Sequence, residues 1–111
     1  MFIEYIDEKI CDLKEEEMQL QNTDRKDEAN LIKIKINICE ICKTLYNVSK
    51  KESSEQKAKE FYLQKIENLS FQWKSSMEKA KEFGEVEKTA IEEIKLETLN
   101  EIKSKYESFF Q

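Results

Sequence analysis

Histidine and proline are absent from this chain of 111 residues, and glycine occurs once. Without histidine, the commonest general base of enzymes is missing, together with the Ser–His and Cys–His pairs that activate nucleophiles. A single glycine leaves no room for the glycine-rich loops that bind phosphate groups. We therefore expect a protein that is not an enzyme, with no catalytic residue and no cofactor.

Long hydrophobic runs are also missing, because no stretch approaches the ~18 apolar residues that a membrane-spanning helix needs. The first residues include Glu4 and Asp7, whereas a signal peptide begins with a basic segment. Three cysteines, an odd number, do not form the disulfide framework of a small secreted protein. These features predict a cytoplasmic protein with reduced thiols and no membrane partner.

Arginine is nearly absent as well, since Arg25 is the only one among 19 basic residues. The net charge of −5 opposes binding to nucleic acid, whose affinity depends on neutralising phosphates. The first thirty residues are acidic and residues 31–65 are basic, which is typical of complementary helix packing. The alternative for the basic segment is an anion site at Lys50, Lys51, Lys57 and Lys59.

Apolar residues recur at helical spacing in four segments, with the single glycine as the only strong helix breaker. Hydrophobic residues make up 39% of the chain, which is enough for one modest core. We predict an all-α fold, a small antiparallel bundle of three to four helices that forms one domain over residues 1–111. The first two helices are expected at 2–21 and 25–50 and the last at 86–109. No internal repeat is evident.

The second of these helices contains an ambiguous segment, since isoleucines alternate with polar residues from Ile32 to Ile38 in the manner of a strand. A longer series at three- and four-residue spacing runs from Leu31 to Val48, and this series favours a helix. Such a helix is apolar over more than half of its circumference, so it must be covered on two sides. It is either the central helix of the bundle or half of a subunit interface.

Local residue choices predict where the helices begin and end. Thr23 or Asp24 is expected to cap the second helix. Ser53 and Gln56 fit a capping box at the start of the third helix. Gly84 is expected to end that helix in a left-handed conformation.

The third and fourth helices carry further expectations. The third is either continuous, kinked or broken near Ser70, and Phe83 should complete its buried face. On the fourth helix, Lys88 and Glu92 lie four residues apart, which predicts an ion pair on the outer face.

Cys39 and Cys42 form a CxxC motif in the middle of the second helix. Redox motifs of this kind place the first cysteine at a helix N-terminus, and a structural zinc site needs four ligands. The only other cysteine is Cys11. We therefore interpret the pair as core residues, since free cysteine packs as a small hydrophobic side chain.

The sequence therefore predicts a non-enzymatic protein-interaction module, such as an adaptor, a regulator or an assembly factor. Its partner would be another protein or a second copy of the chain. The interaction-surface candidates are apolar residues on the second helix, off the main stripes, or at the C-terminus: Ile32, Ile36, Phe61, Phe71, Phe109 and Phe110. The alternative is a small-molecule or metal-binding helical module with Cys11, Cys39 and Cys42 as candidate ligands.

Overall fold

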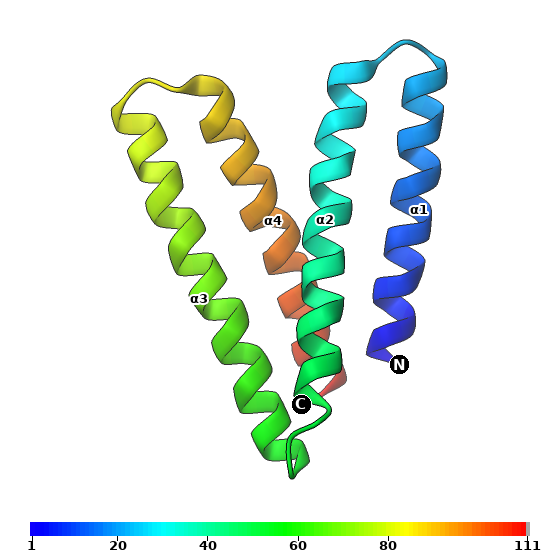
Figure 1. Cartoon of the computed structure of the whole chain (residues 1–111), viewed down its shortest axis with the longest axis vertical. Helices are drawn as coiled ribbons and strands as arrows, with labels where there is room; N and C mark the ends of the chain where they lie inside the picture. Colours follow the sequence, from blue (N-terminus) through cyan, green and yellow to red (C-terminus); the bar gives the residue numbers. More distant parts are fainter. Residues whose placement is uncertain (111) are drawn as a thin grey trace.

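The computed structural model describes residues 1–110, which form four α-helices and no strands within that range (Figure 1). The helices are α1 (Phe2–Asn22), α2 (Lys26–Ser49), α3 (Glu55–Glu82) and α4 (Val86–Phe109). The all-α prediction is confirmed. The alternating isoleucines of α2 are helical because the longer three–four series extends through them. The third helix is continuous through Ser70.

The helices pair into two antiparallel hairpins, α1–α2 (the first hairpin) and α3–α4 (the second hairpin). The hairpins lie together at the end where α2 leads into α3, and they diverge toward their loops (Figure 1). The radius of gyration is 15.4 Å, compared with about 13 Å for a compact domain of this length. The excess reflects this open V shape.

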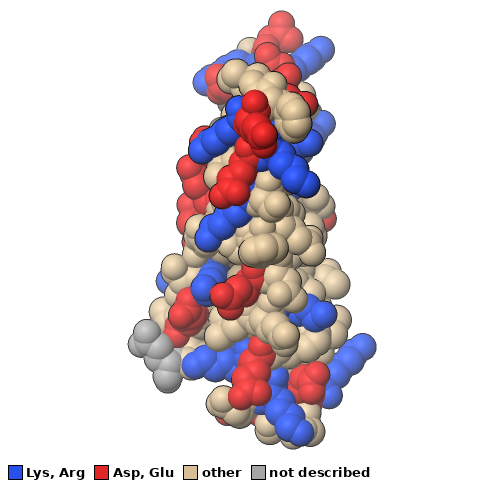
Figure 2. Space-filling view, turned by 90° about the vertical axis from the view of Figure 1, so that its left-hand side faces the viewer, with Lys and Arg blue, Asp and Glu red and all other residues tan. Residues whose placement is uncertain are grey.

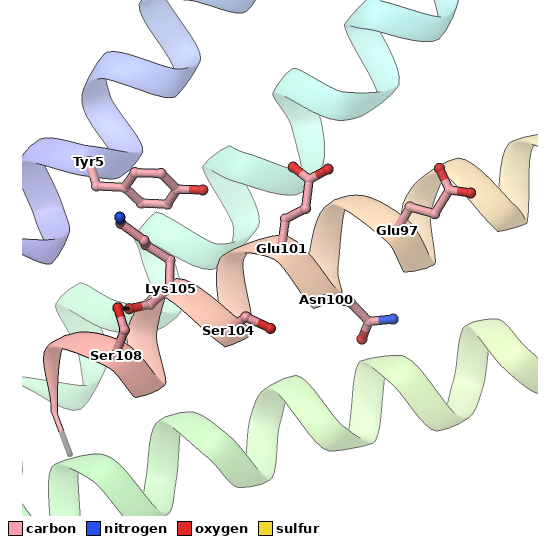
Figure 3. Close-up of a pocket in the computed structure, with 7 residues that line it drawn as sticks. All are labelled: Tyr5, Glu97, Asn100, Glu101, Ser104, Lys105 and Ser108. Carbon is pink, nitrogen blue, oxygen red and sulfur yellow. Dashed lines mark hydrogen bonds between the residues drawn. The ribbon is translucent and has the colours of Figure 1, made fainter.

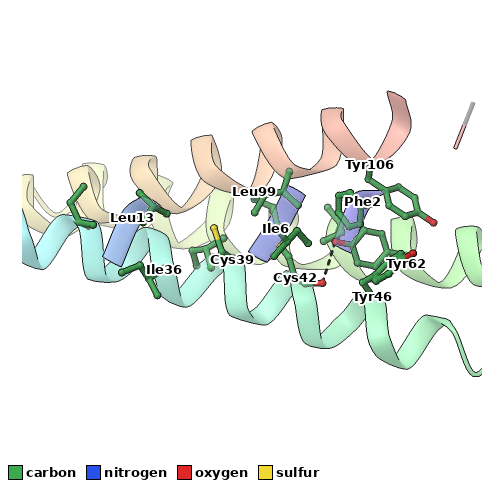
Figure 4. Packing of buried hydrophobic residues seen from close by; sticks show 14 residues of the cluster. Phe2, Ile6, Leu13, Ile36, Cys39, Cys42, Tyr46, Tyr62, Leu99 and Tyr106 are labelled. Carbon is green, nitrogen blue, oxygen red and sulfur yellow. Dashed lines mark hydrogen bonds between the residues drawn. The ribbon is translucent and has the colours of Figure 1, made fainter. Parts of the chain in front are cut away.

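Four aromatic rings form the core where the hairpins meet. They are Phe2, Tyr46, Tyr62 and Tyr106, one from each helix, and every pair of ring centroids lies within 6.3 Å (Figure 4). The Tyr62 hydroxyl donates a hydrogen bond to the Cys42 carbonyl oxygen at 3.2 Å. Edge-to-face aromatic packing of this kind contributes beyond the burial of area alone. This aromatic cluster joins the two hairpins.

The central position of α2 explains its wide apolar surface. It packs along α1, α3 and α4, whereas α1 and α3 meet only where the Phe2 and Tyr62 rings touch, within residues 1–110. Ile32 and Ile36 are 6% and 8% exposed, and Cys39 and Cys42 are fully buried. The central-helix alternative is therefore confirmed, and Ile32 and Ile36 give no reason to infer a subunit interface.

The two hairpins are structural equivalents, each residue of the first matching the residue sixty positions later. The helix boundaries at the two loops follow this offset. Asp24 and Gly84 have φ values of 62° and 68°. The next backbone N–H of each loop donates to the carbonyl oxygen of Leu20 or Ala80, at 2.9 and 2.8 Å. The interpretation that the chain lacks an internal repeat was therefore wrong at the level of structure.

The repeat escapes notice in the sequence because few residues are identical. Identical residues match at six pairs of positions: Ile6 and Ile66, Lys14 and Lys74, Ile34 and Ile94, Lys35 and Lys95, Lys43 and Lys103, and Tyr46 and Tyr106. Burial is preserved where identity is lost, as when Phe2 matches Tyr62 and Cys39 matches Leu99, all at most 1% exposed. The repeat therefore lies in the pattern of buried positions.

Three expectations for the helix ends were wrong. Ser54 rather than Ser53 caps α3, with its hydroxyl oxygen accepting from the Lys57 backbone N–H at 3.1 Å. Arg25 occupies the N-cap position of α2 without a side-chain cap, because the Thr23 hydroxyl donates back to α1 carbonyls. Phe83 does not complete a buried face, since it lies at the end of α3 and is 75% exposed.

Glu92 was also misplaced by the sequence pattern, which put it on the outer face with Lys88. The structure leaves Glu92 only 6% exposed. One of its carboxylate oxygens accepts from Lys95 Nζ at 3.2 Å, and the other has no hydrogen-bond partner in residues 1–110. The equivalent residue of the first hairpin is Ile32, so the second hairpin holds a carboxylate at a core position.

Candidate functional site

The three cysteines do not come together. Cys39 and Cys42 are buried, whereas Cys11 is exposed on α1 (Figure 4 shows the buried pair). Burial raises the pKa of Cys39 to about 11. Burial and the neighbouring Cys39 raise the pKa of Cys42 to about 12. Within residues 1–110 no three histidine, cysteine or acidic side chains cluster in a way that could hold a metal ion, so the metal-binding alternative lacks a ligand set there.

This burial predicts how the thiols react. At pH 8, Ellman's reagent should modify Cys11 in the native protein and leave Cys39 and Cys42 unmodified, because thiolates are the reactive species. All three should react in denaturant. The buried thiols ionise at higher pH in the folded chain than in the unfolded chain. The free energy of unfolding should therefore fall as the pH rises above about 9. Rapid native reaction of more than one thiol per chain would contradict the buried placement.

An open groove lies between α1 and α4 (Figure 3). Its volume is about 820 Å³, and polar side chains of α4 form most of its lining. The lining residues are Tyr5, Glu97, Asn100, Glu101, Ser104, Lys105 and Ser108. Lys105 Nζ lies 5.4 Å from the centre of the Tyr5 ring, and the Ser108 hydroxyl donates to the Lys105 carbonyl oxygen at 2.7 Å.

The electrostatics of this groove do not favour acid–base or nucleophilic chemistry. Lys9 Nζ lies 2.8 Å from a carboxylate oxygen of Glu101, an ion pair that joins α1 to α4. Burial is the largest influence on Lys9 and would lower its pKa, but the hydrogen bond to Glu101 together with the charges of Tyr5, Glu101 and Cys39 outweighs burial, and the pKa is raised. Burial also raises the pKa of Tyr5. Both side chains therefore keep their protons at neutral pH, and neither is an activated nucleophile.

The second hairpin carries the more distinctive surface. Phe71 and Phe83 are each 75% exposed and Val86 is 82% exposed. Figure 2 shows the side of the molecule formed by this hairpin, where uncharged residues predominate in the middle and charged side chains gather toward the two ends. From residue 68 to residue 77 of α3, only Lys74 is charged, in a chain that is 39% charged.

Comparison with the first hairpin shows that the fold does not require these exposed apolar side chains. The residues equivalent to Phe71, Phe83 and Val86 are Cys11, Thr23 and Lys26. The same backbone therefore forms with small or polar side chains at these places. The first hairpin in turn exposes Met18 at 63%, and it is apolar side chains gathered on one face that are typical of binding surfaces.

The six predicted interaction residues differ in solvent exposure. Ile32 and Ile36 are buried inside the chain, and Phe61 is half-buried. Phe109 and Phe110 are 44% and 39% exposed, and both rings pack near Phe2 at the aromatic cluster. Of the six, Phe71 is the most exposed.

Sequence reasoning missed two further exposed residues, Phe83 and Val86, at the loop of the second hairpin. The signal that could have revealed them is Gly84. A glycine that ends a helix places its neighbours in a turn, and side chains in a turn are usually solvent-exposed.

The chain matches no protein-family model, no curated protein and no solved structure. Within residues 1–110, none of the four helices has an apolar stretch long enough to span a membrane.

Proposed function

We propose that this protein is a non-enzymatic interaction module, an adaptor, regulator or assembly factor of the cytoplasm. It binds a protein partner through the exposed apolar surface of the second hairpin. The observation that carries the proposal is the exposure of Phe71, Phe83 and Val86 at positions where the first hairpin has Cys11 and polar residues.

The energetics support this use of the surface. An aromatic side chain that a partner covers can bury about 150–250 Å². At about 25 cal/mol per Å², each covered phenylalanine contributes several kcal/mol before the costs of association. A few such anchors are enough for a specific interface, since a small number of residues usually carries most of the binding energy.

A paired set of variants tests the proposal. Phe71→Ser with Phe83→Ser removes two exposed rings of the second hairpin. Cys11→Ser with Thr23→Ser changes the equivalent positions of the first hairpin and serves as the control. All four positions are exposed, so both double variants should keep the stability of the native chain to within about 0.5 kcal/mol.

The native chain and both variants should be compared by sedimentation at micromolar concentration and by affinity capture from the cells that express the chain. We expect self-association or a captured protein that persists in the first-hairpin control and disappears in the second-hairpin variant. A monomer that captures nothing would overturn the proposal. So would an association that both double variants retain equally.

A further inference from the structure

A second groove lies between α3 and α4 on the second hairpin, with a volume of about 220 Å³. Ile66 is 1% exposed and forms its apolar floor, and Phe71, at 75% exposed, stands at its edge. The complete lining is Ile66, Glu67, Ser70, Phe71, Lys74, Asn100 and Lys103. Apolar, cationic and hydrogen-bonding groups thus share one small depression.

The first hairpin shows how the chain joins its own two helices across the equivalent position. Lys43 Nζ lies 2.7 Å from a carboxylate oxygen of Asp7, which links α2 to α1. Lys14 Nζ lies 4.0 Å from Glu40, which makes a second link between the same helices. Ile10 is partly buried and packs against the core. Two cross-helix ion pairs and an aliphatic side chain therefore occupy this position.

In the second hairpin the two lysines are kept, but their cross-helix ion pairs are not. Lys74 and Lys103 match Lys14 and Lys43, and Asn100 stands where the first hairpin has Glu40, whereas Glu67 keeps the acid that matches Asp7. Within residues 1–110 neither Lys74 nor Lys103 has a carboxylate within ion-pair distance.

Two apolar positions also differ in a way that opens the groove. Ser70 replaces Ile10, which removes side-chain volume, and Phe71 replaces Cys11, which adds an exposed ring. The second hairpin therefore has an open groove that is lined by two lysines, by Glu67 beyond ion-pair distance of both, and by an aromatic ring at the rim.

We infer that this groove binds an acidic amphipathic helix of a partner protein. A carboxylate of the partner takes the place that Glu40 holds in the first hairpin and pairs with Lys74 and Lys103. An apolar side chain next to it covers Phe71 and fills the space above Ser70. This inference rests on the proposed function and names the partner's chemistry at one part of the second hairpin.

The charges and shape of the groove favour this partner over others. A groove between two antiparallel helices suits a third helix whose anchors recur at three- and four-residue spacing. Opposite charges across an interface set specificity and speed association. Nucleic acid is a poorer fit, because the lining supplies two cations, Lys74 and Lys103, which are too few to neutralise a phosphate backbone.

The test uses two synthetic helical peptides and the full chain labelled with ¹⁵N. The acidic peptide has leucine at i, i+3, i+4 and i+7 and glutamate elsewhere, and the basic peptide has lysine in place of glutamate. We expect the acidic peptide to cause saturable amide shifts in residues 66–74 and 100–103. The equivalent residues 6–14 and 40–43 should be unaffected, as should the whole spectrum with the basic peptide.

Two substitutions sharpen the result. Asn100→Glu restores the acid that closes the first hairpin, and Lys74→Glu reverses the charge that meets the peptide. Each should weaken binding of the acidic peptide by about tenfold, since a like charge now faces it. Lys14→Glu, at the equivalent position of the first hairpin, should leave the affinity unchanged. The ¹⁵N spectra of the three variants confirm that each remains folded.

Shifts of equal size in both hairpins, no saturable shift, or full affinity after Asn100→Glu would each overturn the inference. These failures are separate from failure of the proposed function. If a partner depends on Phe71 and Phe83 but binds the Lys74→Glu and Asn100→Glu variants normally, the interaction module stands and the acidic helix is wrong.

Discussion

Replacing Phe2 by alanine should lower the free energy of unfolding by about 3–5 kcal/mol, the usual cost of removing a buried aromatic side chain. Phe2 is the first residue of α1 and is 1% exposed. Its ring lies 5.1 Å from the rings of both Tyr46 and Tyr106, so it contacts both central helices (Figure 4). Because small domains are stable by only about 5–15 kcal/mol, the loss would be a large fraction of the total.

Urea unfolding followed by circular dichroism measures this effect. Phe71→Ala is the matched control, because Phe71 is 75% exposed and its loss should change stability by no more than about 0.5 kcal/mol. If the two variants had equal stability, Phe2 would not belong to the core.

The second large effect concerns the buried carboxylate of the second hairpin. Glu92→Leu should raise the free energy of unfolding by about 1–3 kcal/mol, because it removes a buried carboxylate, while the Lys95 side chain, which is 24% exposed, can still reach solvent. Ile32 at the equivalent position shows that this layer of a hairpin accepts an aliphatic side chain. One oxygen of Glu92 also has no partner within residues 1–110, which makes the native carboxylate costly.

Two further variants complete the comparison by urea unfolding. Lys95→Met should lower stability by about 1–3 kcal/mol, because Glu92 would stay buried without the lysine that it now accepts from at 3.2 Å. Ile32→Glu places a carboxylate at the equivalent core position of the first hairpin, with Lys35 at the position that matches Lys95, and it should be destabilising because a buried aliphatic side chain is replaced by a carboxylate. A Glu92→Leu variant that unfolds more easily than the native chain would show that the carboxylate stabilises the hairpin.

The fold could be predicted because its signal is carried by the spacing of many residues at once. The three–four series from Leu31 to Val48 identified α2 as a helix despite its alternating isoleucines. The details that failed depend on single side chains. Ser53 and Ser54 are both competent caps, and only the backbone path decides between them. Glu92 was assigned to the surface by its charge, although the helical register places it among buried positions.

The candidate surface was harder to predict for a physical reason. An apolar residue off the main stripe is either covered by another helix of the same chain or left for a partner. Ile32 and Phe71 look alike in this respect in the sequence, but only Phe71 remains exposed. The difference is set by which helices meet, and that follows from the pairing of the two hairpins. The groove at Lys74 is recognisable only by comparison with the first hairpin, where the equivalent lysines form cross-helix ion pairs.

The V shape has a mechanical consequence. A helix of 24 residues, such as α2 or α4, is about 36 Å long, and the hairpins meet near only one of its ends (Figure 1). Each hairpin therefore acts as a lever arm with its pivot at the aromatic cluster. A rotation of about 10° at the pivot would displace a loop by about 6 Å, so the distance between the two loops depends on the packing of the aromatic cluster.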